Sequence, residues 1–365
     1  MISRAENKRV IVAMSGGVDS SVSAALLKQK GFEPIGVTIK TWTSGECRDE
    51  KSKGCCSLRD IDDARAVARK IGIPYYVMDL SSDFKEKVID YFVDEYFAGR
   101  TPNPCIECNR TIKFGILLDK ARELGASAVA TGHYARIGYD EGLKRYFIFE
   151  GLDISKDQSY VLFGLDQDQL SKTLLPIGEL QKKEVRALAE KLGLRVFDKP
   201  DSQEICFVKT SYTDFVRQAA PDRLPGKGPI KNKDGREVGL HEGSHEFTIG
   251  QRKRIRVTDT DPYFVTSVDP KQNTVVIGRE TDLYSDRMVV NRLNWQLGPK
   301  EGKVLIKIRS RHDKATGFIS KLISDYEAEV TFEVPQKAVT PGQAAVIYDG
   351  PRILGGGWID KTMKN

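Results

Sequence analysis

The sequence contains no apolar run near the roughly 18 residues that a membrane span requires, so we expect no membrane partner. Residues 1–9 are polar and lack both the apolar stretch of a secretion signal and the features of a transit peptide, which favours a cytoplasmic location. Six cysteines in 365 residues are too few for a disulfide framework. With 40% hydrophobic and 30% charged residues, the composition is typical of a globular protein with a large core.

The sequence also lacks internal repeats and low-complexity segments. At about 150 residues per domain, 365 residues predict two or three domains. The 57 Lys and Arg residues exceed the 51 Asp and Glu residues by 6. This mild positive charge permits a polyanionic partner but does not require one.

Strands and helices alternate over about the first 200 residues. Gly31 and Gly72 are natural stops after the first two helices, and Ser57 with Asp60 resembles a capping box. The rhythm predicts an α/β fold, a doubly wound parallel sheet with helices on both faces. The predicted strands are 9–14, 34–42, 75–80 and 126–130, and the predicted helices are 20–30, 57–71, 84–97 and 112–124.

Beyond about residue 207 the helical periodicity fades, and short β-rich runs predict small barrels or sandwiches. Turn signals separate these runs, among them Gly355-Gly356-Gly357. We place one domain boundary near residue 208 and a second near 284. The predicted strands are 245–249, 263–268, 274–277, 304–308, 327–332 and 344–348.

The segment Ser15-Gly16-Gly17-Val18-Asp19-Ser20 lies between the first strand and the first helix. Ligands of open α/β sheets bind at the carboxyl ends of strands, and a helix N-terminus suits an anion. The adjacent glycines allow the backbone to approach a phosphate, while Ser15 and Ser20 add hydroxyl donors. Asp19 fits beside a phosphate if a cation lies between them, so we predict a Mg²⁺ contact there.

This loop is neither a Walker A loop nor a G-x-G-x-x-G motif. A Gly-rich turn without function is the plain alternative. The pattern S-G-G-x-D-S after a first strand resembles the signature of the PP-loop ATP pyrophosphatases. That resemblance implies cleavage of ATP between the α and β phosphates and transfer of AMP to a substrate oxygen.

Cys105 and Cys108 have C-x-x-C spacing within 101–109, where two prolines predict a stiff loop rather than a helix. Cys206 supplies a third thiol. Three functions compete: persulfide chemistry, an iron–sulfur cluster with three cysteine ligands, and structural zinc with His133 as the nearest fourth ligand. Buried inert thiols are the alternative without function. Cys47, Cys55 and Cys56 lie in a polar stretch, and we assign them no function.

Together, the PP-loop, the Pro-Asn-Pro-Cys-x-x-Cys-Asn segment and Cys206 resemble the tRNA-specific 2-thiouridylases, the MnmA family. The resemblance runs from residue 13 to 357, so it covers nearly the whole chain. Further segments carry it: Ala130–Ala135, Lys156–Tyr160, Thr248–Lys253, Ala338–Ala344 and Leu354–Gly357.

The resemblance implies a PP-loop catalytic domain over 1–208, a small central tRNA-contacting domain over 209–283 and a C-terminal β-barrel, also tRNA-contacting, over 284–365. Cys108 corresponds to the family's nucleophile and Cys206 to its persulfide carrier, and the two close a transient disulfide. Its ATP contacts correspond to Ala13, Met14, Ser15, Gly16, Gly17, Val18, Asp19, Ser20, Ile39 and Gly132. Its target-base contacts correspond to Asn103, Pro104 and Cys105, and its other tRNA contacts to His133, Lys156, Asp157, Gln158, Arg311, His312 and Gln343.

The chain departs from the family pattern at three positions. Many members have Asp at the position of Cys105, which weakens an acid–base role there and strengthens the three-thiol interpretation. Many have Met at Ile39, and an aromatic residue is common at His312.

The implied reaction is ATP-dependent 2-thiolation of the wobble uridine of tRNA, with ATP and Mg²⁺ as cofactors and a [4Fe–4S] cluster on Cys105, Cys108 and Cys206 as the alternative sulfur route. The expected partners are the anticodon loops of Lys, Glu and Gln tRNAs and a sulfur-carrier or cysteine desulfurase protein that loads the persulfide. We expect a monomer. The basic runs 251–256 and 309–312 fit a tRNA partner but are also typical of a solvated face. The rival functions are a PP-loop enzyme that amidates a small molecule and a non-catalytic RNA-binding protein.

Overall fold

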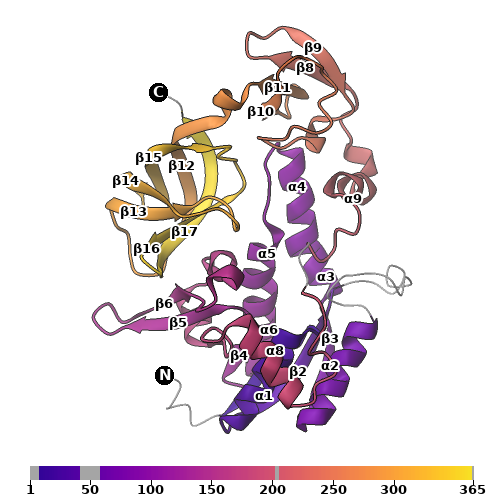
Figure 1. The fold of residues 1–365 in the computed structure, drawn as a ribbon, viewed down its shortest axis with the longest axis vertical. Coiled ribbons are helices and arrows are strands. Elements are labelled where there is room, and N and C mark those ends of the chain that lie inside the picture. Colours follow the sequence, from indigo (N-terminus) through magenta and orange to yellow (C-terminus); the bar gives the residue numbers. More distant parts are fainter. Residues whose placement is uncertain (1–7, 42–57, 202–204, 364–365) are drawn as a thin grey trace. The chain divides into compact units, whose positions relative to one another are not determined.

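The computed structural model describes residues 8–41, 58–201 and 205–363, which divide into two compact units (Figure 1). The first unit comprises the chain up to Val88 together with Cys105–Lys209 and Pro351–Ile353. The second comprises Ile89–Pro104, Thr210–Gly350 and the chain from Leu354 onward.

A five-stranded sheet forms the centre of the first unit, and all its pairings are parallel. This confirms the predicted parallel α/β fold. The chain builds β1, β2 and β3 in one direction, then returns to add β4 and β7 on the other side of β1. Such a reversal creates a switch point at the carboxyl ends of the two strands that flank it, here β1 and β4. The order is β3 (Tyr75–Asp79), β2 (Glu33–Lys40), β1 (Arg9–Ala13), β4 (Ala128–Ala130) and β7 (Thr173–Leu174).

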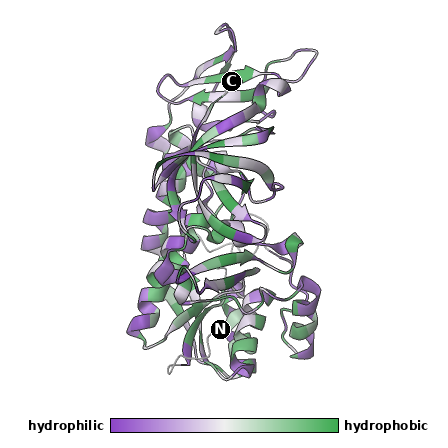
Figure 2. Cartoon of the chain, turned by 90° about the vertical axis from the view of Figure 1, so that its left-hand side faces the viewer, coloured by the Kyte–Doolittle hydropathy of each residue, from purple (hydrophilic) through white to green (hydrophobic). Residues whose placement is uncertain are grey.

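Three helices share one apolar core with the sheet. Alternate residues of and just after β1, namely Val10, Val12 and Met14, are fully or almost fully buried in this core. Figure 2 shows helices that carry both hydrophilic and hydrophobic residues, as expected of helices packed on a sheet. The core helices are α1 (Val18–Gln29), α2 (Leu58–Ile71) and α8 (Lys182–Lys191), while α6 (Leu117–Glu123) contacts β4.

The predicted helix stops are confirmed. Gly31 and Gly72 follow α1 and α2 with φ of +79° and +70°, the left-handed conformation that glycine adopts without a Cβ penalty. The capping interaction predicted for Ser57 lies outside the described residues.

The prediction of a loop over 101–109 is wrong from Pro104 onward. A helical turn, α5, spans Pro104–Glu107, and a π-helical segment, η2, continues from Cys108 to Ile116 and runs into α6. Pro104 occupies the first helical position, where a missing N–H removes no intrahelical hydrogen bond. Cys105 and Cys108 therefore lie in the first turns of a helix. The helix predicted at 112–124 begins earlier than expected.

Other elements of the first unit extend or add to the prediction. The helix predicted at 84–97 is confirmed, but it begins at Ser81 and passes into the second unit after Val88. It consists of α3 (Ser81–Phe84), the π-helical η1 (Lys85–Asp90) and α4 (Tyr91–Phe97). The sequence did not predict the antiparallel hairpin of β5 (Ala135–Asp140) and β6 (Arg145–Glu150).

A small four-stranded sheet belongs to the second unit, with the order β10-β11-β8-β9. The strand predicted at 245–249 is wrong, because Ser244–Glu246 forms a 3₁₀ turn (η6) and Phe247 packs into the small core beside the sheet. The preceding helix is α9 (Tyr212–Ala219). The strands are β8 (Gly228–Asn232), β9 (Glu237–His241), β10 (Phe264–Asp269) and β11 (Thr274–Gly278).

Six strands form the C-terminal barrel, ordered β12-β15-β14-β13-β16-β17 and closed by pairing of β12 with β17. The predicted turn at Gly355–Gly357 is wrong, because these glycines lie inside β17. A Cβ at Gly357 would lie 2.4 Å from the carbonyl oxygen of Asn291 on β12, so glycine permits close strand pairing. The strands are β12 (Tyr284–Trp295), β13 (Gly302–Lys307), β14 (Ala315–Ser324), β15 (Glu327–Lys337), β16 (Ala344–Asp349) and β17 (Arg352–Met363).

Candidate active site

The loop between β1 and α1 is shaped by Gly16. Its φ is +72°, and a Cβ there would lie 2.2 Å from the carbonyl oxygen of Asp60 on α2, so no other residue fits without displacing backbone. Gly17 precedes α1 as its N-cap and supplies no side-chain cap. The first N–H groups of α1 therefore have no capping side chain at Gly17, as an anion site requires.

The two serines of the loop are held together. The Ser15 backbone N–H donates to the Ser20 hydroxyl at 3.2 Å, and the two hydroxyl oxygens lie 3.4 Å apart. The Ser20 hydroxyl also lies 3.2 Å from the Gly17 carbonyl, to which it donates. Both predicted hydroxyl donors are thus part of one preorganised loop.

Residues after β4 meet this loop. A Cβ at Gly132 would lie 2.6 Å from the backbone nitrogen of Ser20 and 2.7 Å from the carbonyl carbon of Asp19. The structure therefore brings Gly132 against the first turn of α1, at the switch point of the sheet. Ile39 lies near the carboxyl end of β2, the neighbour of β1.

Asp19 has two partners that sequence reasoning missed. The Lys182 ammonium, at the start of α8, lies 2.8 Å from both carboxylate oxygens, and the Tyr134 hydroxyl donates to Oδ1 at 2.8 Å. Burial, reinforced by the Asp19 charge, raises the pKa of Tyr134, so this hydroxyl remains a donor. Contact with Asp19 thus holds the Lys182 ammonium beside the predicted phosphate loop.

The Asp201 carboxylate contacts three cationic side chains. It lies 2.7 Å from Lys182, 2.9 Å from Lys156 and 3.1 Å from Arg186. Burial alone would raise the pKa of Asp201, but the hydrogen bonds from Lys182 and Lys156 outweigh it and lower the pKa. Lys156, a predicted tRNA contact, is thus engaged with Asp201, and Lys182 connects Asp201 to Asp19.

A second missed lysine supports the loop from the side of α2. The Lys199 ammonium donates to the Gly16 carbonyl at 2.9 Å and lies 2.7 Å from both Asp60 and Asp63. Desolvation would lower the pKa of Lys199, but the two carboxylates outweigh it and raise the pKa. Lys199 therefore stays charged and fixes the Gly16 carbonyl.

His133 is buried, and its Nδ1 lies 2.7 Å from the Thr131 hydroxyl. Burial, together with the charge of Lys113, holds its pKa well below the ordinary value. The ring is therefore neutral at pH 7 and offers one donor and one acceptor.

Asp157 and Gln158 are both engaged within the fold. The Asp157 carboxylate accepts hydrogen bonds from the backbone N–H groups of Gly151 and Ser159, at 2.9 and 3.1 Å. Gln158 and Tyr134 exchange two hydrogen bonds, one from the Gln158 backbone and one to its side chain. Asp157 thus fixes the chain on either side of it, and Gln158 holds Tyr134 in place.

The thiols of Cys105, Cys108 and Cys206 all belong to the first unit. Cys105 is exposed, whereas Cys108 and Cys206 are partly buried. Phe207, next to Cys206, packs edge-on against Phe84 of α3 at 5.8 Å, and α3 also contacts η2, which begins at Cys108. Cys47, Cys55 and Cys56 lie outside the described residues.

Within the described residues, no three His, Cys, Asp or Glu side chains lie close enough together to hold a metal ion. That set includes Cys105, Cys108 and Cys206. The three thiols as placed here do not fit an iron–sulfur cluster.

The remaining predicted tRNA contacts lie in the second unit. The Gln343 amide donates to the Thr101 carbonyl at 2.9 Å, in the segment that leads to Asn103 and Pro104. Arg311 is exposed and His312 half-buried in the connection between β13 and β14.

Curated relatives match the chain over almost its full length. The tRNA-specific 2-thiouridylase MnmA 1 of Caldanaerobacter subterraneus subsp. tengcongensis is 48% identical, covering 98% of this chain and 99% of the relative. The chain belongs to the tRNA-specific 2-thiouridylase family. The MnmA protein of Symbiobacterium thermophilum is also 48% identical, over 98% of this chain and 93% of the relative, and that of Geotalea uraniireducens is 47% identical over 100% and 98%.

Three domain families also match this member of the family. Residues 8–210 match the tRNA methyl transferase HUP domain, residues 213–279 the tRNA methyl transferase PRC-barrel domain, and residues 285–359 the Aminomethyltransferase beta-barrel domain. Among the described residues, no helix has the length and apolar character needed to cross a membrane.

Proposed function

We propose that this chain thiolates C2 of the tRNA wobble uridine in two steps, adenylation of the C2 oxygen by ATP and sulfur transfer from a persulfide on Cys206. As a member of the thiouridylase family, the chain is an ATP-dependent tRNA-uridine 2-sulfurtransferase. The observation that carries the proposed mechanism is the Gly16–Gly17 loop with Lys182 bound to Asp19, in the same unit as Cys108 and Cys206.

In the adenylation step, the N–H groups at the start of α1 and the hydroxyls of Ser15 and Ser20 hold the ATP phosphates. Lys182 contributes the charge that balances the leaving pyrophosphate. The C2 oxygen of uridine attacks the α phosphorus, pyrophosphate leaves, and C2 becomes electrophilic. The remaining proposed ATP contacts are Ala13, Met14, Val18, Ile39 and Gly132.

Asp19 is the residue that would hold Mg²⁺, because a carboxylate oxygen is the ligand this ion prefers. Bound there, the ion would supply charge neutralisation for the phosphates. The Lys182 ammonium contacts both Asp19 oxygens and balances the carboxylate charge, as a bound cation would.

In the sulfur step, the Cys108 thiolate attacks the inner sulfur of the Cys206 persulfide. A Cys108–Cys206 disulfide forms, the terminal sulfur leaves as hydrosulfide, and this attacks C2 and expels AMP. The sulfane sulfur is reduced by two electrons as the two cysteines are oxidised, so a cellular thiol reductant must restore them. The shared contacts of the Phe207 and Cys108 segments with α3 support this pairing.

The proposed substrate is the anticodon loop of Lys, Glu and Gln tRNAs, with the wobble base extruded from its stack. The target-base contacts are Asn103, Pro104 and Cys105. A sulfur-carrier protein or cysteine desulfurase loads Cys206, and the enzyme acts as a monomer. We propose a catalytic role for 1–208 and tRNA contacts for 209–283 and 284–365.

In the alternative sulfur route, Cys105, Cys108 and Cys206 would hold a [4Fe–4S] cluster, which would supply the sulfide. The three side chains, all among the described residues, are not grouped to hold a metal, which disfavours this route. Iron and sulfide analysis after anaerobic purification separates the routes. Stoichiometric iron, with activity that tracks it, would overturn the persulfide route.

Pyrophosphate release from ATP, measured with and without unmodified tRNA, tests the proposed function. We expect release that depends on tRNA, and 2-thiouridine at the wobble position by mass spectrometry when a persulfide donor is present. Release driven by a small carboxylic acid instead of tRNA would indicate an amidating enzyme, and no release would indicate an RNA-binding protein.

A further inference from the structure

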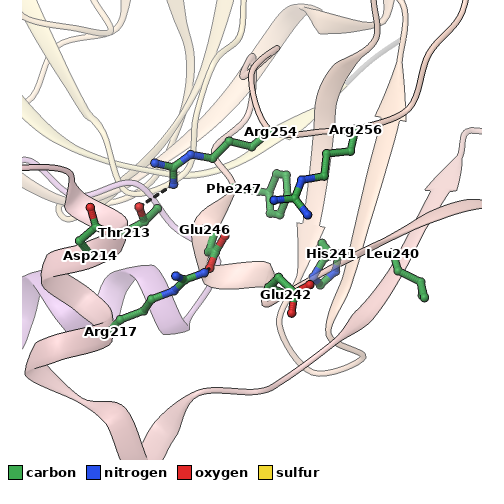
Figure 3. Close-up of a pocket in the computed structure, with 10 residues that line it drawn as sticks. All are labelled: Thr213, Asp214, Arg217, Leu240, His241, Glu242, Glu246, Phe247, Arg254 and Arg256. Carbon is green, nitrogen blue, oxygen red and sulfur yellow. Dashed lines mark hydrogen bonds and ion pairs between the residues drawn. The ribbon is translucent and has the colours of Figure 1, made fainter.

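A pocket of about 210 Å³ opens in the second unit, between α9, the end of β9 and the 254–256 segment (Figure 3). Its volume is below the roughly 300 Å³ at which pockets for drug-sized ligands begin, so it suits a small group rather than a large cofactor. No residue of this pocket belongs to the ATP or cysteine sites. The residues that line it include Thr213, Arg217, His241, Glu246, Arg254 and Arg256.

Two arginines reach this pocket from one short segment. Arg254 and Arg256 have φ of +72° and +54°, and Ile255 between them is buried in the small core. Figure 3 shows the Arg254 guanidinium turned toward Thr213, whereas that of Arg256 lies beside Phe247 and His241. Positive φ is uncommon for residues other than glycine and persists where the surroundings demand it.

The positive charge of Arg256 is not compensated. Among the described residues, Arg256 makes no hydrogen bond or ion pair, whereas Arg254 donates to the Thr213 hydroxyl at 2.5 Å. The three carboxylates that line the pocket have partners other than Arg256. Glu246 pairs with Arg217, Asp214 accepts from the Ser211 hydroxyl at 2.6 Å, and Glu242 lies 4.0 Å from Lys227.

His241 supplies a second, independent sign of a ligand. The side chain lines the pocket at 4% exposure, and neither ring nitrogen has a hydrogen-bond partner of good geometry. Burial lowers the pKa of His241 and outweighs the Asn273 backbone, Glu246 and Glu242, which raise it, so the ring is neutral at pH 7. Buried polar groups in native proteins are nearly always paired, so an unpaired one in a pocket points to a partner that is absent.

We propose that this pocket binds one phosphate group of the tRNA backbone, held by the Arg256 guanidinium and the ring N–H of His241, with Arg254 adding positive charge at the same pocket. Guanidinium groups match the oxygens of a phosphate in charge and geometry. This inference rests on the proposed function, because tRNA is the carrier of that phosphate. It adds a backbone contact remote from the reacting base, which positions the tRNA without reading its sequence.

Arg256→Gln tests the site, with Arg236→Gln as the matched control. Both arginines are exposed, both lie in the same unit, and only Arg256 lines the pocket. We expect Arg256→Gln to raise the Kd for unmodified tRNA about 5–10-fold at low salt, and to lower the slope of log K against log salt by about 1. Arg236→Gln should change Kd less than about 2-fold. Equal changes in the Kd for tRNA in the two variants would contradict the proposed phosphate site.

His241→Leu separates binding from folding. Leucine removes the unpaired ring nitrogens, so we expect the Tm of the free protein to rise while tRNA affinity falls. A lower Tm with unchanged tRNA affinity would assign His241 to the fold alone and overturn its part in the site.

The source of the phosphate is distinguished by titration. The histidine ring signals of the wild-type protein are followed by NMR with tRNA and with inorganic phosphate, and assigned by the His241→Leu variant. A response to tRNA supports the proposal, whereas a response to inorganic phosphate alone would overturn it in favour of a small-anion site. Wild-type protein that fails to thiolate tRNA contradicts the proposed function, whereas active wild type with equal Arg256→Gln and Arg236→Gln variants contradicts only this site.

Discussion

Lys182 links Asp19 to Asp201, because its ammonium nitrogen lies 2.8 Å from both oxygens of Asp19 and 2.7 Å from Oδ1 of Asp201. An ammonium group has three N–H donors, and these three contacts account for all of them. A phosphate that takes a hydrogen bond from Lys182 must therefore displace a carboxylate. Displacement from Asp19 would leave that carboxylate open to a cation, which is the arrangement we propose for the ATP-bound site.

Lys182→Gln should weaken ATP binding, because the amide keeps hydrogen-bonding capacity but loses the charge. A hydrogen bond to a charged group contributes about 1.5–3 kcal/mol, so we expect the KM for ATP to rise about 10–100-fold. The measurement is tRNA-dependent pyrophosphate release as a function of ATP concentration. Lys183→Gln is the control, since Lys183 is exposed and does not contact Asp19. Equal KM values for the two variants would rule out a phosphate role for Lys182.

Local patterns in the sequence were sufficient for the strand–loop–helix unit at the start of the chain and for the parallel sheet, because a buried strand, two glycines and a helix start are contiguous between residues 9 and 29. The partners of that loop could not be predicted. Lys182 and Lys199 are ordinary lysines more than 160 residues away from Asp19, and only the tertiary packing of α8 and of the segment after it brings them to the loop. The one available signal was the placement of Lys182 at a helix start, which many lysines share.

The two wrong predictions, the loop from Pro104 onward and the turn at Gly355–Gly357, also have physical causes. Pro104 favours a loop in isolation but is also suited to the first helical position, and tertiary packing decided for the helix. Gly355–Gly357 have the composition of a turn, yet they lie in a strand whose neighbour approaches too closely for a Cβ. Local composition alone does not separate these cases.

Gly16→Ala should destabilise the loop, whereas Gly17→Ala should not. Alanine at Gly16 must adopt φ of +72° with its Cβ 2.2 Å from the Asp60 carbonyl oxygen, while a Cβ at Gly17 meets only the Ser15 hydroxyl at 3.5 Å. We expect Gly16→Ala to lose about 1–3 kcal/mol of the free energy of unfolding and Gly17→Ala less than about 0.5 kcal/mol. Urea unfolding of both variants checks this. Comparable losses would mean that the loop accommodates a side chain at either glycine.

His133 should make the protein less stable as the pH falls below about 6.5, the ordinary pKa of histidine. Burial holds the native pKa of His133 well below that value. Between the two pKa values, the unfolded chain therefore binds a proton on His133 and the native state does not. Its contribution to stability is complete above pH 6.5 and is lost towards the native pKa, at up to about 1.4 kcal/mol per pH unit. Between pH 6.5 and 5, His133→Gln should show a shallower dependence of the unfolding free energy on pH than wild type. Identical slopes would contradict the assignment of a neutral buried ring.

The three thiols can be separated by serine variants assayed for both half-reactions. If Cys206 carries the persulfide and Cys108 resolves it, Cys206→Ser and Cys108→Ser should each retain tRNA-dependent pyrophosphate release and lose 2-thiouridine formation in a single turnover. Cys105→Ser should retain both, because Cys105 has no covalent role in that scheme and the serine hydroxyl keeps the polar contact proposed with the target base. A three-cysteine cluster makes the opposite prediction for Cys105, since two remaining cysteines would not hold the cluster. Single-turnover thiolation by Cys206→Ser with a persulfide donor and ATP would rule out the carrier role, and loss of thiolation in Cys105→Ser would favour the cluster.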